Sequence, residues 1–204
     1  MDKDVEKQLL NQAYWNERWE NRQMGWDIGY ASTPIVEFID SYKNKDAAIL
    51  VPGCGNAYEA NYLLDQGFTN ITLIDIAPKL VEDVRKRMEG KANIKVLLGD
   101  FFDHEGSYDL ILEQTFFCAI DPTLRPKYIS KTASLLKEEG LLAGVLFNIH
   151  FQRPGPPFGG HDEEYRPAFE KSFELQVMEP CRNSIPERKG SELFIKLKKK
   201  NVQN

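Results

Sequence analysis

Short apolar runs alternate with helix-length amphipathic stretches over most of the chain. Continuous apolar runs of this kind are typical of parallel strands that are covered on both faces. The predicted strands span residues 48–52, 70–75, 94–98, 108–113 and 140–147. The predicted helices between them span residues 56–66, 78–89 and 124–138, with Gly140 expected to separate the last helix from its strand. This alternation predicts a doubly wound α/β fold.

The C-terminal part of the chain follows a different pattern. Two further strand-like runs, 173–178 and 193–197, are separated by the polar loop 183–190 and by no helix-length segment. A connection this short permits an antiparallel pair but not a parallel crossover. We therefore expect a Rossmann-like, mostly parallel sheet of seven strands that ends in an antiparallel hairpin.

The N-terminal part of the chain is predicted to be helical. Residues 6–21 contain no glycine or proline, and Trp15 and Trp19 stand four positions apart, on one face of a helix. A second helix is expected from Pro34 to Tyr42, because proline is favoured at the first helical position.

Length and composition indicate one domain with a sizeable core. The 204 residues are 42% hydrophobic and 28% charged, which is ordinary for a globular protein. We assign all of them to a single domain, in which residues 1–45 form a helical cap and residues 46–204 the Rossmann-like core. No apolar segment approaches the length of a membrane span.

Charge and cysteine usage narrow the setting and the partners. A formal net charge of −5 disfavours a nucleic-acid binder that relies on phosphate neutralisation. Three cysteines do not suggest a disulfide framework, and the polar N-terminus does not resemble a signal peptide. We expect a cytoplasmic protein with a small-molecule partner, no membrane and no nucleic acid, present as a monomer.

The most informative motif is a glycine turn after the first predicted strand. Gly53, Cys54 and Gly55 follow that strand, and Asp75 ends the second strand, twenty positions after Gly55. In a βαβ unit, such glycines let the backbone approach a ligand, and the acid accepts hydrogen bonds from ribose hydroxyls. The motif predicts an adenosine-containing cofactor.

The residues after the glycine turn favour a cofactor without phosphate. A dinucleotide site requires a small residue where this chain has Tyr58, and the helix that follows begins with Glu59. An acid at the helix start would compete with a pyrophosphate for the positive helix end. S-adenosylmethionine, a sulfonium without phosphate, fits better than NAD, which remains the alternative.

Seven short motifs, in order, resemble the thiopurine S-methyltransferase family of class I S-adenosylmethionine-dependent methyltransferases, including its thiol and halide methyltransferase branch. The resemblance extends from about Trp15 to Lys198. The motifs are WNERW at 15–19, GWDIG at 25–29, VPGCG at 51–55, GDFF at 99–102, FCAIDP at 117–122 with RP at 125–126, GPPF at 155–158, and SIP at 184–186 with RKG at 188–190.

The resemblance implies a set of cofactor-binding residues. The N-terminal segment closes over the cofactor in the family, and a tryptophan face near a sulfonium is favourable through cation–π attraction of about 0.5–2 kcal/mol. One of Glu113 and Gln114, at the end of the fourth strand, is also expected to face the cofactor. The full set is Trp15, Trp19, Trp26, Gly53, Cys54, Gly55, Asp75, Ile76, Asp100, Phe101, Glu113 and Gln114.

The resemblance also implies an acceptor pocket. Arg125 and Arg188 are the expected catalytic residues, because a soft anionic nucleophile needs a positive pocket rather than a strong base. His161 is the candidate base if the acceptor is a neutral thiol. The expected substrate-binding residues are Phe117, Pro156, Pro157, Phe158 and His161, and no metal is expected.

The function these residues predict is methyl transfer by in-line displacement to a small sulfur or halide acceptor, such as a thiol, bisulfide, thiocyanate, halide or thiopurine. S-adenosylhomocysteine would be the product of the cofactor. Two alternatives stay open: an NAD-dependent oxidoreductase and a non-catalytic adenosyl-binding protein.

Overall fold

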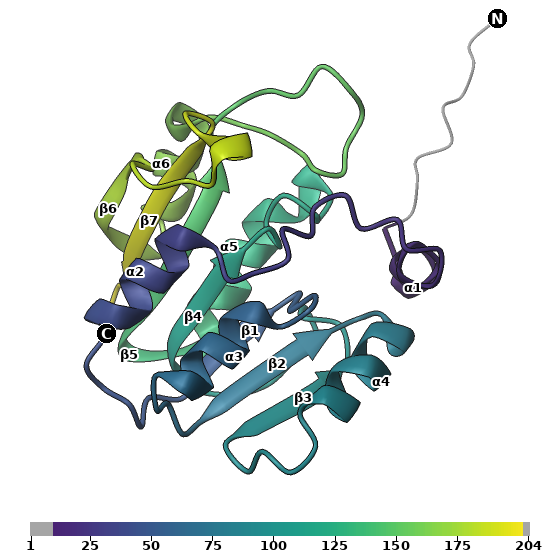
Figure 1. The fold of residues 1–204 in the computed structure, drawn as a ribbon. Coiled ribbons are helices and arrows are strands. Elements are labelled where there is room, and N and C mark those ends of the chain that lie inside the picture. Colours follow the sequence, from purple (N-terminus) through teal and green to yellow (C-terminus); the bar gives the residue numbers. More distant parts are fainter. Residues whose placement is uncertain (1–9, 202–204) are drawn as a thin grey trace, which may run out of the picture.

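The computed structural model describes residues 10–201, which form a seven-stranded sheet with helices on both faces (Figure 1). The strands lie side by side in the order β3-β2-β1-β4-β5-β7-β6. They are β1 (Ile49–Pro52), β2 (Ile71–Asp75), β3 (Ile94–Leu98), β4 (Tyr108–Gln114), β5 (Leu136–Phe147), β6 (Phe173–Pro180) and β7 (Glu192–Lys199). Strands β1 to β5 pair in parallel, and β7 lies antiparallel between β5 and β6. The predicted fold class is confirmed.

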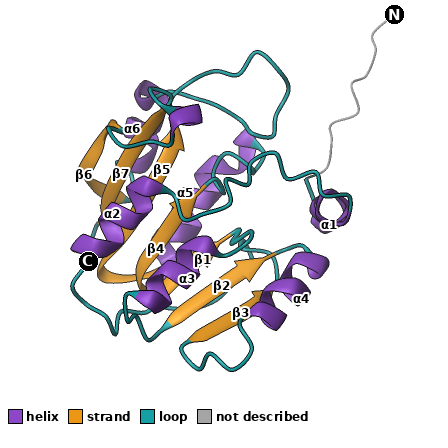
Figure 2. Ribbon diagram, in the orientation of Figure 1, coloured by secondary structure: helices purple, strands orange, loops and turns teal. Residues whose placement is uncertain are grey.

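Five of the helices divide between the two faces of the sheet (Figure 2). Helices α2, α3 and α4 cover one face, and α5 and α6 cover the other. The helices of the described residues are α1 (Gln12–Glu20), α2 (Thr33–Ser41), α3 (Tyr58–Asp65), α4 (Pro78–Arg87), α5 (Arg125–Leu135) and α6 (Asp162–Phe169), with 3-10 turns η1 (Pro122–Leu124) and η2 (Pro186–Arg188).

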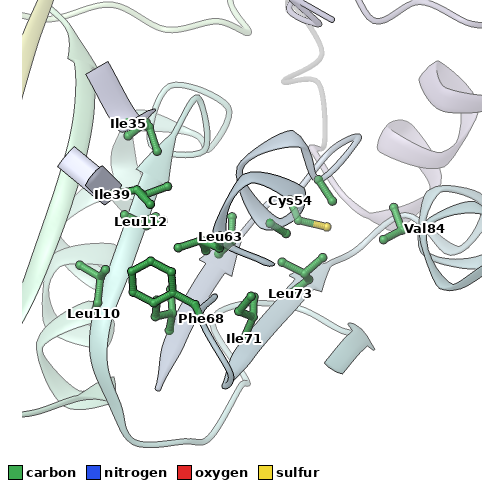
Figure 3. Packing of buried hydrophobic residues seen from close by; sticks show 14 of the residues in the cluster. Ile35, Ile39, Cys54, Leu63, Phe68, Ile71, Leu73, Val84, Leu110 and Leu112 are labelled. Carbon is green, nitrogen blue, oxygen red and sulfur yellow. The ribbon is translucent and has the colours of Figure 1, made fainter. Parts of the chain in front are cut away.

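Strand β1 explains why its sequence is apolar throughout. Ile49 and Val51 pack into the cluster under α2, α3 and α4, whereas Leu50 packs into the cluster under α5 and α6. Figure 3 shows the first cluster, in which Ile39 of α2 and Leu63 of α3 lie close to the side chains of the strands. Because successive side chains of a strand point to opposite faces, a strand buried on both faces must be apolar at every position.

The boundary between α5 and β5 differs from the prediction. The helix ends at Leu135 rather than at residue 138, and Gly140 lies inside the strand. Leu136 already pairs with Tyr108, and the register then shifts before Leu141 pairs with Leu110. This irregular strand start carries no clear turn sequence, which is why the sequence pattern extended the helix.

Helix α6 is absent from the sequence prediction. It has only eight residues and contains Pro167, so its helical pattern is weak. At the other end of the chain, the predicted helix over residues 6–21 begins outside the described residues, and its described part is α1.

Helix α1 packs on α4, away from the sheet itself (Figure 1). The indole N–H of Trp19 donates to the carboxylate of Asp83 at 3.3 Å, and the backbone N–H of Lys79 donates to the side-chain oxygen of Asn16 at 2.8 Å. Within residues 10–201, no helix is long and apolar enough to cross a membrane.

Candidate active site

A cavity of about 500 Å³ lies at the carboxyl ends of the parallel strands, within the size range of small-molecule sites. One side of its wall comes from the loops that follow β1, β2, β3 and β4. The other side comes from the N-terminal segment and from the loop that follows β5. The lining residues with predicted roles are Trp15, Trp19, Trp26, Gly53, Gly55, Asp75, Ile76, Asp100, Phe101, Pro156 and Pro157.

The glycine turn after β1 has a backbone that requires glycine. Gly53 and Gly55 adopt φ angles of +58° and +48°, in the left-handed region that side chains disfavour. A Cβ atom on Gly53 would lie 2.4 Å from Cδ2 of Phe116. The backbone N–H of Gly53 donates to the carbonyl of Ile74 at 2.8 Å, which ties the turn to the end of β2. The turn therefore presents bare backbone to the cavity.

Asp75, the last residue of β2, places a carboxylate on the cavity wall. Burial raises the pKa of this carboxyl to about 6, although hydrogen bonds from backbone N–H groups at Ala77, Gly55 and Ile76 oppose the shift. The Ala77 N–H donates to Oδ1 at 3.0 Å. A carboxylate in this position can accept hydrogen bonds from hydroxyl groups of a ligand.

The loop after β3 supplies a second carboxylate and aromatic rings. Asp100 and Phe101 both line the cavity, and Oδ1 of Asp100 accepts a hydrogen bond from the Phe102 N–H at 2.8 Å. The Phe101 ring is held by edge contacts to Phe102 and Phe116, with centroids 5.6 and 5.2 Å apart. This end of the cavity can hold a flat aromatic ligand group.

The N-terminal segment contributes a wall of tryptophans. The Trp15 and Trp26 rings meet edge to face, with centroids 5.6 Å apart. The Trp26 carbonyl accepts a hydrogen bond from Nη2 of Arg188 at 3.1 Å, which fastens this segment to the region before β7. All three tryptophans of the chain line the cavity.

The turn after β4 is the part of the wall that sequence reasoning missed. Thr115 lines the cavity with a φ angle of +60°, an outlier for a β-branched residue. Phe116 and Cys118 line it as well. No residue type in this stretch indicates the conformation; only its position after a parallel strand does, because that edge of such sheets binds ligands.

Arg125 lies behind the wall instead of on it. Its Nη2 donates to the carbonyls of Phe158 and Gly159, at 3.3 and 3.0 Å, and its guanidinium stacks 4.7 Å from the ring centre of Phe117. Phe117 is buried in the core cluster, and neither it nor Phe158 lines the cavity. The arginine thus holds the loop that brings Pro156 and Pro157 to the cavity.

Arg188 is also outside the lining. Its side chain is 11% exposed, and its Nη1 lies 3.4 Å from the Glu192 carboxylate. Its guanidinium carbon lies 5.5 Å from the ring centre of Phe147. Together with its hydrogen bond to Trp26, these contacts make Arg188 a connection between the N-terminal segment and the sheet.

His161 does not line the cavity. Its Nδ1 lies 3.3 Å from the Asn148 side-chain oxygen, and its ring packs 4.3 Å from that of His150, centroid to centroid. Of the two cysteines near the site, Cys54 is buried outside the lining and Cys118 is part of it. Burial raises the pKa of both thiols, that of Cys118 to about 12, so both are neutral at physiological pH.

The expectation for Glu113 and Gln114 is not met, because neither lines the cavity. Glu113 is completely buried, and its carboxylate is occupied by the turn N–H groups and by Tyr128. The side-chain oxygen of Gln114 is buried too. The end of a strand lies at the right edge of the sheet, but the alternation of its side chains decides which of them faces a ligand.

The chemistry of the described wall is restricted. Among residues 10–201, the lining includes no lysine, arginine or histidine, and its carboxylates are Asp75, Asp100 and Asp121. Asp121 caps the η1 turn, accepting hydrogen bonds from the Thr123 N–H and hydroxyl at 2.9 and 2.6 Å. No group of three His, Cys, Asp or Glu side chains in the described part of the chain is arranged to hold a metal ion.

Comparisons with known proteins agree with this geometry. The profile of the family described as thiopurine S-methyltransferase matches residues 10–203. Probable thiol methyltransferase 2 of Arabidopsis thaliana is 30% identical over 191 residues, covering 91% of this chain and 84% of that protein. Thiocyanate methyltransferase 1 of Brassica oleracea is 28% identical over 200 residues, covering 95% of this chain and 88% of that protein.

A solved structure shows the same fold. It is 1,6-didemethyltoxoflavin-N1-methyltransferase of Burkholderia thailandensis, with bound 1,6-didemethyltoxoflavin and S-adenosylhomocysteine. It matches this chain with a TM-score of 0.73 at 16% identity, covering 93% of this chain and 87% of that one.

Proposed function

The chain belongs to the thiopurine S-methyltransferase family, and we propose that it transfers a methyl group to a small sulfur or halide anion in the cavity at the carboxyl ends of the strands. It is an S-adenosylmethionine-dependent methyltransferase. An NAD-dependent oxidoreductase finds no support among these relatives.

The residues of the cavity fit S-adenosylmethionine. The bare backbone at Gly53 leaves room for a ligand where a side chain would meet Phe116, and Asp75 offers a carboxylate for ribose hydroxyls. We assign Asp100 and Phe101 to the adenine group and the tryptophan wall to the sulfonium side. When bound, this cofactor supplies an electrophilic methyl group: the acceptor's electron pair forms the new bond to carbon while the carbon–sulfur bond breaks.

The observation that carries the acceptor class is the absence of a base from the described cavity wall. The lining among residues 10–201 has no histidine, lysine or arginine, and Asp121 is engaged in capping. An alcohol or ammonium acceptor needs a group that removes its proton, whereas thiocyanate, bisulfide, a thiolate or a halide brings a free electron pair. The apolar side chains of Phe116, Ile120 and Pro157 suit a soft, weakly hydrated anion.

The two arginines behind the wall supply positive potential. Burial and the charge of Glu113 raise the pKa of the Cys118 thiol, whereas the charges of Arg188 and Arg125 lower it. Cys118 lines the cavity, so the arginines act electrostatically on that part of the wall. The same attraction would favour an anionic acceptor there without a direct ion pair, and this is the role we propose for Arg125 and Arg188.

Replacing Arg125 by glutamine should lower kcat/KM for the acceptor about tenfold, equal to about 1.4 kcal/mol, the order of a lost hydrogen bond to a charged group. Affinity for S-adenosylhomocysteine should stay within about threefold of wild type. Steady-state kinetics with thiocyanate and calorimetry with S-adenosylhomocysteine measure the two effects. Arg125→Lys is the control, since it keeps the charge but cannot hold two carbonyls and stack on Phe117. Equal losses of both affinities would contradict the role.

Cofactor affinity should depend on pH through Asp75. Its pKa is about 6 in the free protein, and the ionised form accepts hydrogen bonds from ribose hydroxyls. Below pH 6 the carboxyl binds a proton that must leave, so the dissociation constant of S-adenosylhomocysteine should rise about tenfold from pH 7.5 to pH 5. Calorimetry across this range, repeated with Glu113→Gln to remove the other titrating carboxyl, checks the assignment. A flat profile would refute it.

The remaining expectations for the chain are proposals as well. We propose that residues 1–45, described from residue 10 onward, act as the cap that closes the cofactor site, since the three tryptophans of this segment contribute to the wall. A monomer in the reducing cytoplasm is proposed because the three cysteines are free thiols.

The function is tested by incubating the protein with S-adenosylmethionine and, separately, iodide, thiocyanate, bisulfide and a small thiol. Methylated volatile products in the headspace are the expected result, and their relative rates rank the acceptors. An alcohol and an amine of similar size are the matched controls and should give no product. Methylation of these controls alone would overturn the acceptor class while leaving the cofactor assignment intact.

A further inference from the structure

A completely buried carboxylate joins strand β4 to the turn that forms the cavity wall. Oε1 of Glu113 accepts hydrogen bonds from the backbone N–H groups of Phe116 and Phe117, both at 2.8 Å. Oε2 accepts a third hydrogen bond, from the Tyr128 hydroxyl of α5 at 2.6 Å. One oxygen thus serves the turn and the other serves a helix on the far side of the sheet.

The turn depends on an acceptor at this position. Phe117 is buried, so its N–H needs a partner inside the protein, and strand pairing does not reach beyond Gln114 on β4. Thr115 also holds its unfavourable left-handed conformation immediately before these two N–H groups. Such a conformation persists only where the surroundings determine it, and the Glu113 carboxylate is the group that fixes both N–H directions.

The turn in turn shapes both ends of the cavity. Thr115, Phe116 and Cys118 line it, and the Phe116 ring occupies the space next to Gly53. A shift of the two amides would therefore move the floor under the glycine turn and the wall at Cys118 together.

We propose that Glu113 is a positioning residue for methyl transfer: by accepting the N–H groups of Phe116 and Phe117, it holds residues 115–118 in the arrangement that forms the cavity. The acceptor readout below rests on the proposed function, whereas the cofactor readout does not. Burial raises the pKa of Glu113 to about 7, and its titratable neighbours are Tyr128 on α5, Cys118 in the turn and Glu192 on β7 across a small adjoining space. Hydrogen bonding by Oε1, not the charge, is the required property, since a proton on Oε2 leaves Oε1 able to accept.

Three variants separate this role from a general effect on stability. Glu113→Gln keeps a carbonyl oxygen for both N–H groups and turns its amide toward the Tyr128 oxygen. Glu113→Asp keeps the charge but is one methylene too short to reach both N–H groups. Tyr128→Phe removes the bond to Oε2 and leaves the turn side intact.

The experiment measures the S-adenosylhomocysteine dissociation constant, kcat and KM at pH 8, with circular dichroism and thermal melting as the folding check. Glu113→Gln and Tyr128→Phe should remain within about threefold of wild type in affinity and kcat. Glu113→Asp should be folded, yet bind S-adenosylhomocysteine at least about tenfold more weakly and turn over more slowly.

The proposal is overturned if Glu113→Gln loses about tenfold in affinity, which would mean that the charge is required, or if Glu113→Asp behaves as wild type. If the aspartate variant does not fold, the glutamine and phenylalanine variants still decide, because a large loss in either one contradicts it. If wild type methylates none of the acceptors tested, the proposed function fails, while the affinities still test the role of Glu113.

Discussion

Gly53→Ala is expected to weaken S-adenosylhomocysteine binding at least about tenfold, because left-handed strain of about 1–2 kcal/mol adds to a steric conflict. The residue has a φ angle of +58°, and the new Cβ would lie 2.4 Å from Cδ2 of Phe116. The ring cannot simply move aside, since the N–H of its own residue is held by Glu113. The conflict should instead displace the glycine turn that forms the cofactor side of the cavity. Calorimetry with S-adenosylhomocysteine measures the loss.

Two other glycines provide matched controls for this prediction. Gly55 has a φ angle of +48° but nothing within 4 Å of an added Cβ, so Gly55→Ala should show the strain without the conflict and a smaller loss. Gly25 has open space and no positive φ, so Gly25→Ala should bind as wild type. Equal affinities for the variants at Gly53 and Gly25 would refute the prediction.

Asp75→Ala is expected to lower cofactor affinity by about 1–3 kcal/mol, or about 5- to 150-fold, the range for losing hydrogen bonds to a charged group. The physical reason is that the carboxylate faces the cavity at the end of β2, where it can accept from both ribose hydroxyls. Calorimetry at pH 8, where the group is ionised, gives the largest difference from wild type.

Asp75→Asn distinguishes a binding role from a structural one. The amide oxygen can still accept the Ala77 N–H, so the local turn should persist. Burial raises the pKa of Asp75 above its ordinary value, which means that the ionised carboxylate reduces folding stability above pH 6. The asparagine variant should therefore bind more weakly and yet unfold at an equal or higher temperature at pH 8. Unchanged affinity would remove Asp75 from the ribose site.

The cofactor side of the site could be predicted from the sequence because it is built from local segments. Gly53, Asp75 and Asp100 each follow a parallel strand directly, and the carboxyl ends of parallel strands meet at one edge of the sheet. An apolar run that ends in glycine or an acid therefore specifies both the strand and the place of the residue in the cavity.

The acceptor side could not be predicted in the same way, because its geometry depends on contacts between distant segments. Arg125 meets the carbonyls of Phe158 and Gly159 more than thirty positions along the chain, so it holds a loop where its motif suggested direct contact with an acceptor. Thr115 lines the cavity through a backbone conformation that no local sequence pattern indicates.

Glu113 shows most clearly where the two sources of information part. Its position at the end of a buried parallel strand, and hence at the functional edge of the sheet, follows from the apolar pattern alone. Whether its carboxylate enters the cavity or the core is decided by tertiary structure: only after β4 is packed do the N–H groups of Phe116 and Phe117 and the Tyr128 hydroxyl converge on it. A buried carboxylate must be satisfied by such donors, so their arrangement determines its direction. The sequence by itself thus determined the fold, the cofactor and the edge at which the chemistry occurs. The packing of the turn, the cap and the loop after β5 decided which side chains form the wall, because those contacts join residues far apart in the chain.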